Sequence, residues 1–194
     1  EDSIIDLGTY SVDGNAFYNY GVVTVEGSNQ IDMGGPQALL PVLNPLPFYN
    51  YGVIDFQDGA PNDYLLITGD FAGDGDINVD VSGLHGTADQ LYIDGSVVTG
   101  TVQTINVDLL DLPNTIETIV PIVYVSGDSV ASNFELGDVT WDEDNSFVTL
   151  GFDLIADIDA SNATPDVFSL GIEVTGLSDP GTLAASIPGA IQSL

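Results

Sequence analysis

The stretch "FYNYGV" occurs twice in this chain of 194 residues, at Phe17–Val22 and again at Phe48–Val53. The second copy begins 31 residues after the first. Each copy is followed by another short β-like run, "VTVEG" or "IDFQDG". A shared stretch of this length that includes its aromatic residues indicates an internal structural repeat. We therefore expect the two copies to occupy equivalent places in successive units of the fold.

Two further pairs of segments repeat at a similar distance. "NDYLLITG" at Asn62–Gly69 is answered by "ADQLYIDG" at Ala88–Gly95, a spacing of 26. "INVDV" at Ile77–Val81 is answered by "INVDL" at Ile105–Leu109, a spacing of 28. A unit of this size can form one coil of a solenoid, in which stacked neighbours bury a shared core. The three spacings together predict a β-solenoid.

The aromatic residues of the repeated stretch are expected to be architectural. Neighbouring strands lie about 4.8 Å apart, so identical side chains at equivalent positions stack into ladders. The expected pairs are Phe17 over Phe48, Tyr18 over Tyr49 and Asn19 over Asn50. The sequence offers no aromatic platform with a clear spacing for a carbohydrate.

Short runs rich in Val, Ile, Thr, Tyr and Phe alternate with Gly, Asn, Asp and Pro along the chain, which is typical of all-β proteins. In "DINVDV" the apolar residues Ile77, Val79 and Val81 alternate with polar ones, so one face of this strand is expected to be buried. The segment Met33–Phe48 carries four prolines and is expected to be an inserted loop. No helix of normal length is expected before residue 180.

The charge of the chain is extreme. It has 30 acidic residues, one histidine and no lysine or arginine, which gives a formal net charge of −30. Charged residues are nevertheless only 15% of the chain and hydrophobic residues 44%, so a core can form, most simply in one domain. Without cations the chain cannot neutralise phosphates, which excludes nucleic acid as a partner and disfavours anionic membranes. The chain has no cysteine and no apolar run as long as a membrane-spanning helix requires, so neither a thiolate site nor such a helix is expected.

The segment "GDFAGDGDINVD" resembles a calcium-binding loop. Asp70, Asp74 and Asp76 supply hard oxygen ligands, and Gly75 suits the turn, which makes Ca²⁺ the one cofactor we predict. The match fails at Ala72 and Val81, where such loops carry ligands, and a simple turn between strands explains the same residues. A second candidate, "WDEDNS" at Trp141–Ser146, is also read more simply as a hairpin turn.

No catalytic residue is predicted. His85 is the one histidine, and a triad with Ser82 and Asp89 is conceivable, but no nucleophile elbow is present and a histidine in a surface loop explains the sequence better. Pairs of carboxylates occur throughout the chain, so glycoside hydrolysis by two acids is formally open. An acidic polysaccharide would lack a cation to hold it, which leaves neutral glycans as the substrate class.

The residues from about 15 to 194 resemble the C-terminal part of the passenger region of bacterial autotransporters. Members of that family commonly run from an N-x-G-x-I-D strand through a G-x-x-x-D-x-L-x-I-x-G-x-F segment to a G-x-x-D-x-L-x-I-x-G segment that is followed by a further glycine. The corresponding residues here are Asn50, Gly52, Ile54 and Asp55, then Gly59, Asp63, Leu65, Ile67, Gly69 and Phe71, then Gly86, Asp89, Leu91, Ile93, Gly95 and Gly100. Two features differ from the family's pattern: its members carry a barrel after the region that ends here at Leu194, and lysine and arginine are missing from this sequence.

The resemblance implies a right-handed parallel β-helix that is exported and displayed outside the cell. Within an all-β fold we expect β-solenoid coils over residues 1–115, further β strands forming a cap over 116–178, paired antiparallel in part, and a connector-like or docking tail over 179–194. The expected location is secreted or on the extracellular face of the outer membrane, either as a processed fragment or as a free unit. The chain itself is not expected to insert into a membrane.

The leading functional hypothesis is a non-enzymatic structural or adhesive module, with a host or matrix surface component as its partner. Because the ends of a solenoid are open, head-to-tail contact with a second copy would form a fibre, with divalent cations or high salt offsetting the like charge. The alternative is a carbohydrate-active or carbohydrate-binding passenger domain. Converging acids in a cleft would favour the enzyme, and smooth faces would favour the structural module.

Overall fold

The computed structural model describes residues 3–6, 16–33, 47–141 and 148–177, and over these ranges the protein is all-β, as the sequence predicts. One short 3-10 helix, Ala131–Asn133, accompanies the strands in the described ranges. None of the helical structure in these ranges is long and apolar enough to cross a membrane.

The strands form three sheets, in which most neighbours are parallel. The seven-stranded sheet has the order β1 (Ser3–Asp6), β4 (Ser28–Asp32), β7 (Tyr64–Thr68), β11 (Gln90–Asp94), β13 (Glu117–Val125), β16 (Asp166–Leu177) and β15 (Val148–Asp157). The six-stranded sheet has the order β14 (Phe134–Thr140), β12 (Gln103–Asp111), β9 (Asp76–Ser82), β6 (Val53–Asp55) and β3 (Val22–Thr24), and β10 (Thr87–Ala88) also pairs with β9. The three-stranded sheet has the order β2 (Phe17–Asn19), β5 (Phe48–Asn50) and β8 (Phe71–Gly73).

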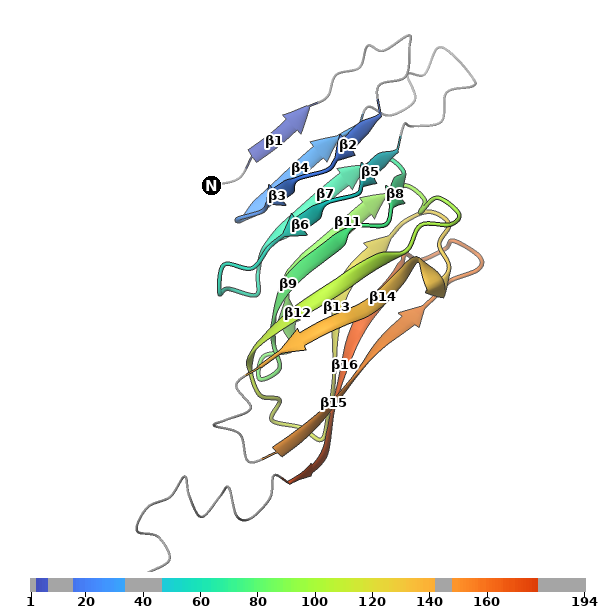
Figure 1. Cartoon of the computed structure of the whole chain (residues 1–194). Helices are drawn as coiled ribbons and strands as arrows, with labels where there is room; N and C mark the ends of the chain where they lie inside the picture. Colours follow the sequence, from blue (N-terminus) through green and yellow to red (C-terminus); the bar gives the residue numbers. More distant parts are fainter. Residues whose placement is uncertain (1–2, 7–15, 34–46, 142–147, 178–194) are drawn as a thin grey trace, which may run out of the picture.

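The chain visits the three sheets repeatedly in the same order. It passes through β2, β3 and β4, then β5, β6 and β7, then β8, β9 and β11, and each strand pairs in parallel with its counterpart in the next passage. We call these passages repeats one, two and three. A fourth repeat continues through a bridge between Phe71 and Val97 and then through β12 and β13. Figure 1 shows the strands stacked along one axis, from β1 at one end to β15 and β16 at the other.

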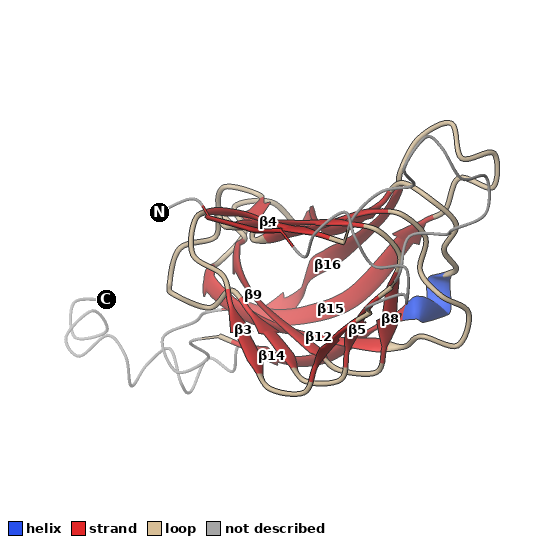
Figure 2. Cartoon of the chain, turned by 90° about the horizontal axis from the view of Figure 1, so that it is seen from above, coloured by secondary structure: helices blue, strands red, loops and turns tan. Residues whose placement is uncertain are grey.

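The sheets enclose one interior. Seen from above, the seven-stranded sheet lies on one side and the six-stranded and three-stranded sheets lie opposite it (Figure 2). Among the described strands, each sheet is open, because its first and last strands each have one neighbour.

The register predicted from the sequence repeats is confirmed at all three spacings. Phe17, Tyr18 and Asn19 pair with Phe48, Tyr49 and Asn50, which is the spacing of 31. The spacing of 26 appears where β7 pairs with β11, and the spacing of 28 where β9 pairs with β12. The short identical segments therefore mark equivalent positions in neighbouring repeats.

Alternation along each strand sends apolar side chains inward, where they stack from repeat to repeat. Ile54, Ile77 and Ile105 form one such column in the six-stranded sheet, and all three are fully buried. The rings of Phe48 and Phe71 stack in the three-stranded sheet with centroids 5.8 Å apart. Each fully buried side chain of this size contributes about 1.5–3 kcal/mol relative to an exposed one.

A buried amide ladder runs beside this apolar core. The Asn19 amide donates to the Asn50 carboxamide oxygen at 2.8 Å, and the Asn50 amide donates to the Gln103 carboxamide oxygen at 2.7 Å. Repeat three carries Gly73, with φ +108, and Gly75 beside this ladder. A Cβ at Gly75 would overlap the Asn50 side chain, so this glycine leaves the space through which Gln103 reaches across repeat three.

The C-terminal strands change direction. β13 pairs in parallel with β11 on one edge and antiparallel with β16 on the other, and β16 pairs antiparallel with β15. Antiparallel pairing among residues 116–178 agrees with the expectation for this region. Phe168, Leu170 and Ile172 of β16 are buried and close this end of the core.

Several sequence expectations fall outside the described residues. They are most of the proline-rich loop, at 34–46, most of "WDEDNS", within 142–147, and the tail from 178 onward.

Candidate functional site

Four tyrosines from repeats one and two gather on the outer face of the three-stranded sheet. Tyr18 lies in β2 and Tyr49 in β5, while Tyr20 and Tyr51 lie two residues further on, in the bends that follow these strands. Because Phe17 and Asn19 point inward, the residues that alternate with them point outward. We call Tyr18, Tyr20, Tyr49 and Tyr51 the tyrosine cluster.

The four rings are nearly parallel and form a two-by-two array. Between repeats, the ring centroids are 4.7 Å apart for Tyr18 and Tyr49 and 5.4 Å apart for Tyr20 and Tyr51. Within a repeat, they are 6.2 Å apart for Tyr18 and Tyr20 and 5.9 Å apart for Tyr49 and Tyr51. The angles between the ring planes range from 4° to 12°. The ladder of Tyr18 and Tyr49 thus lies beside the ladder of Tyr20 and Tyr51, and each ring contacts two others.

The cluster is open to solvent. Tyr20 is 74% exposed, Tyr18 51% and Tyr51 41%. Contiguous exposed aromatic surface of this kind marks a contact site more often than an accident of packing. Because one face of the Tyr20 ring stacks on Tyr51, its high exposure means that its other face and its edges are accessible.

The ladders stop at repeat three, where small residues replace the tyrosines. Ala72 pairs with Tyr49, and by the same register Asp74 follows Tyr51. Partial burial raises the pKa of Tyr51, with smaller contributions from the neighbouring tyrosines and from the negative charge of Asp74. A carboxylate thus lies at the repeat-three side of the array, and the chain has no lysine or arginine to pair with it.

The expectation that the chain offers no aromatic platform with a clear spacing does not hold for these four tyrosines, whose rings are regularly spaced. The signal was present, because Tyr18 and Tyr20 are two residues apart in a strand-like stretch, as are Tyr49 and Tyr51. Period two places both members of each pair on one face, and the repeat brings the two pairs together. The ladder of Tyr18 and Tyr49 was predicted, but the ladder of Tyr20 and Tyr51 and the exposure of both were not.

The three aspartates of the predicted calcium site lie along the connection from β7 through β8 to β9. The Asp70 carboxylate accepts a hydrogen bond from the Ser96 N–H at 2.9 Å, Asp74 is exposed in the bend after β8, and Asp76 begins β9. In the described part of the chain, no three His, Cys, Asp or Glu side chains converge in a way that could hold a metal ion. The geometry adds no support for calcium here, and this site stays a prediction.

The conceivable triad of His85, Ser82 and Asp89 does not form. His85 is exposed in a loop, and the Ser82 hydroxyl donates to the Asp111 carboxylate at 2.9 Å. The Asp89 carboxylate accepts from the backbone N–H groups of Asp63 and Asp80. The interpretation of His85 as a residue of a surface loop is confirmed.

A group of buried aspartates, Asp63, Asp80 and Asp89, fastens the six-stranded sheet to the seven-stranded sheet. The Asp89 carboxylate accepts hydrogen bonds from the N–H groups of Asp63 and Asp80, both at 2.8 Å. Asp63 in turn accepts from the Gly27 N–H at 2.7 Å, so two of these carboxylates each cap the preceding repeat. The second oxygen of Asp63 has no hydrogen-bond partner among the described residues.

Burial controls the protonation of these groups. Asp89 is fully buried, and desolvation raises its pKa to about 7 against the opposing effect of its two N–H partners. Desolvation likewise raises the pKa of Asp63 and Asp80. Because all three side chains are buried, these carboxylates cannot reach a substrate outside the protein.

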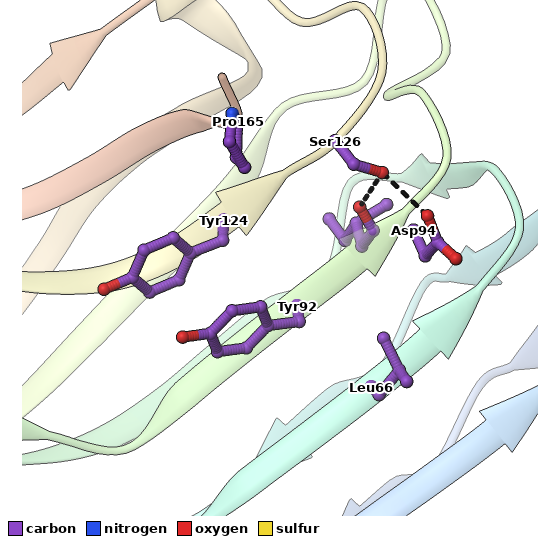
Figure 3. A pocket seen from close by; sticks show the side chains of 7 residues that line it. Leu66, Tyr92, Asp94, Tyr124, Ser126 and Pro165 are labelled. Atoms are coloured by element: carbon purple, nitrogen blue, oxygen red, sulfur yellow. Dashed lines mark hydrogen bonds between the residues drawn. The ribbon is translucent and has the colours of Figure 1, made fainter. Parts of the chain in front are cut away.

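A second tyrosine ladder lines a small pocket on the seven-stranded sheet. The rings of Tyr92 and Tyr124 stack with centroids 4.3 Å apart, and they line the pocket together with Leu66, Asp94, Ser126 and Pro165 (Figure 3). Burial raises the pKa of Tyr92 to about 12, so its hydroxyl stays protonated near neutral pH. With a volume of about 210 Å³, the pocket is smaller than most sites for small-molecule ligands.

Comparisons with protein-family models, with curated proteins and with solved structures gave no match for this chain.

Proposed function

We propose that the protein is a non-enzymatic, extracellular structural or adhesive module built as a right-handed parallel β-helix with a C-terminal β cap. The proposal for the fold is supported by the four repeats, which pass through the three sheets in one order with a parallel register. A stack of this kind is stiff and presents long exposed faces, which suits a scaffold more than an enclosed active site.

The autotransporter relationship is part of this proposal, and with it a location on or outside the bacterial surface. Its support is the placement of the motif residues. Asp63 and Asp89 precede β7 and β11 at equivalent corners, and Gly69 and Gly95 follow the same two strands. A Cβ at Gly95 would overlap the backbone of Gly69, so the motif glycine answers a physical need of the stack.

The tyrosine cluster is the adhesive surface in this proposal, and its exposure is the observation that carries the function. Tyrosine supplies a large amphipathic contact area at a low cost in side-chain entropy. The stacked rings are already ordered before contact, which lowers that cost further.

Carbohydrate binding is the second candidate, and one observation favours it over an enzyme that degrades carbohydrate. The rings of Tyr49 and Tyr51 are nearly parallel and lie beside the Asp74 carboxylate, an arrangement that can stack against sugar rings and accept hydrogen bonds from their hydroxyls. Hydrolysis would need two accessible carboxylates on either side of a glycosidic bond. The buried aspartates described above cannot take those roles.

Bead retention under flow tests the adhesive role. Beads coated with equal amounts of wild-type protein or of a Tyr18→Ser/Tyr20→Ser/Tyr51→Ser variant are washed over gelatin-coated glass at rising shear. We expect the variant beads to detach at clearly lower shear, because the exposed rings supply the contact. The matched control is Tyr124→Ser, which removes a tyrosine from the other ladder. Equal detachment of all three kinds of bead would contradict the proposal.

A further inference from the structure

We propose that the tyrosine cluster, together with Asp74, binds arginine side chains on an extended segment of a partner protein. This inference names the partner of the adhesive surface and therefore rests on the proposed function. It follows from three features of the described residues: accessible ring faces, the spacing of the rings, and the charge around them.

The ring faces provide the first step. The face of an aromatic ring carries negative potential and attracts a cation placed over it. The accessible face of Tyr20 lies on the side away from Tyr51, while on the repeat-three side the small residues Ala72 and Asp74 follow the Tyr49–Tyr51 pair. A cation on the repeat-three side would contact the ring faces of Tyr49 and Tyr51 and the carboxylate of Asp74 at the same time.

The spacing of the rings provides the second step. The two rings of each pair are 6.2 Å and 5.9 Å apart. Alternate residues of an extended chain are about 6.6 Å apart and point to the same side. A segment with arginine at every second position therefore places one guanidinium over each ring of a pair.

Charge decides between partners. The chain carries −30 and no lysine or arginine, so a cation inside the protein does not compete for the rings or for Asp74. An anionic partner is repelled, and a second copy of this chain has no lysine or arginine with which to bind. A neutral glycan is not attracted by the negative charge of the site. Arginine suits the site better than lysine because its planar guanidinium stacks on a ring and pairs with a carboxylate through two hydrogen bonds.

The test measures peptide binding by calorimetry at physiological salt. The probe is an octapeptide of alternating arginine and serine, compared with peptides carrying lysine or neutral citrulline in place of arginine. We expect the arginine peptide to bind at least about tenfold more tightly than the citrulline peptide, and more tightly than the lysine peptide. In a Tyr20→Ser/Tyr51→Ser variant the affinity for the arginine peptide falls about tenfold, and in Asp74→Asn about threefold.

Two control variants separate the site from the general charge. Tyr124→Ser removes a tyrosine of the other ladder, and Asp138→Asn removes an exposed carboxylate on β14, so both leave the affinity within about twofold. Unchanged thermal unfolding shows that each variant is folded. If the double tyrosine variant binds as tightly as these controls, the attraction is only that of the acidic surface, and the inference is wrong.

The remaining outcomes distinguish this inference from the proposed function. If neutral oligosaccharides such as cellohexaose bind through Tyr20 and Tyr51 while the arginine peptide does not, the partner is wrong and the adhesive role stands. If the arginine peptide binds through the tyrosines but coated beads are not retained, the adhesive role fails and this inference stands.

Discussion

At the scale of single residues, this protein compensates its carboxylates with N–H and O–H donors because it has no cations. Asp32 accepts from the Thr68 hydroxyl at 2.7 Å on the neighbouring strand. Asp94 accepts from the hydroxyl of Ser126, just after β13, at 2.9 Å, and Asp108 accepts from the hydroxyl of Thr140 on β14 at 3.0 Å. These donors offset only part of the repulsion between acids, because Asp108 still pairs in register with Asp80 on the neighbouring strand.

Asp89 makes the folded state more stable at acidic than at neutral pH. Its pKa rises from 3.8 to about 7 on folding, so the folded protein binds more protons than the unfolded chain between these values. The stabilisation linked to this proton is fully present below the unfolded pKa and is lost as the pH rises through about 7. Asp63 and Asp80, whose pKa values are also raised, act in the same direction.

We predict that the free energy of unfolding is higher at pH 5.5 than at pH 7.5, by up to about 2 kcal/mol from Asp89. In Asp89→Asn this difference shrinks, because the titrating group is gone. The measurement is urea unfolding at both pH values, with exposed Asp138→Asn as the control that keeps the wild-type difference. A full wild-type difference in Asp89→Asn would show that Asp89 does not cause it.

At the scale of strands, ladders of equivalent side chains hold the repeats in register. The sequence allows the ladders to be predicted where identical residues recur, as in Phe17 with Phe48. It does not reveal ladders in which the residue type changes. Gln103 completes the ladder of Asn19 and Asn50 although it lies far beyond Asn50 in the sequence, because its longer side chain reaches past the glycines of repeat three.

We predict that Asn50→Ala lowers the free energy of unfolding by about 2–4 kcal/mol, because Asn19 and Gln103 each lose a buried hydrogen bond and the Gln103 carboxamide oxygen loses its donor. The matched control is Asn106→Ala on β12, whose partly buried amide donates to Asn78 at 3.0 Å and should cost less than about 1.5 kcal/mol. Urea unfolding of both variants makes the comparison. Equal losses in the free energy of unfolding would mean that the buried amide ladder contributes no more than the partly buried pair of Asn106 and Asn78.

The candidate site was harder to predict than the fold, for a physical reason. Periodicity and repeats report which residues share a face, so the sheets and their register could be predicted. Whether a face is covered depends on neighbours distant in the sequence, so neither the exposure of Tyr20 nor the complete burial of Asp89 could be read from the pattern. Tyr20 is largely exposed although it follows an aromatic stretch, and Asp89 is fully buried although it is acidic.

At the scale of the whole molecule, a charge of −30 without internal counter-charges opposes the compact state. Salt screens this repulsion, with a Debye length near 10 Å at about 0.1 M. The same repulsion would oppose head-to-tail assembly of copies. Assembly into fibres, if it occurs, therefore requires salt or divalent cations, and it stays a prediction.

We predict that the melting temperature rises from low to high sodium chloride. The predicted calcium site adds a second expectation, a further rise with calcium chloride at matched ionic strength that disappears in Asp70→Asn/Asp74→Asn/Asp76→Asn. Thermal unfolding followed by circular dichroism measures both effects. A melting temperature unaffected by salt and by calcium would contradict the role of self-repulsion, and a response to ionic strength alone would argue against a calcium site.

The central claim is that stacked repeats bring tyrosines from two separate parts of the sequence into one exposed array. Nuclear Overhauser effects between the ring protons of isotopically labelled protein test it most directly, since ring centroids lie 4.7 Å apart for Tyr18 and Tyr49 and 5.4 Å apart for Tyr20 and Tyr51. We predict cross-peaks within both pairs in the free protein. Cross-peaks confined to tyrosines within one repeat, with none between the two repeats, would contradict the register, the cluster and the function proposed for it.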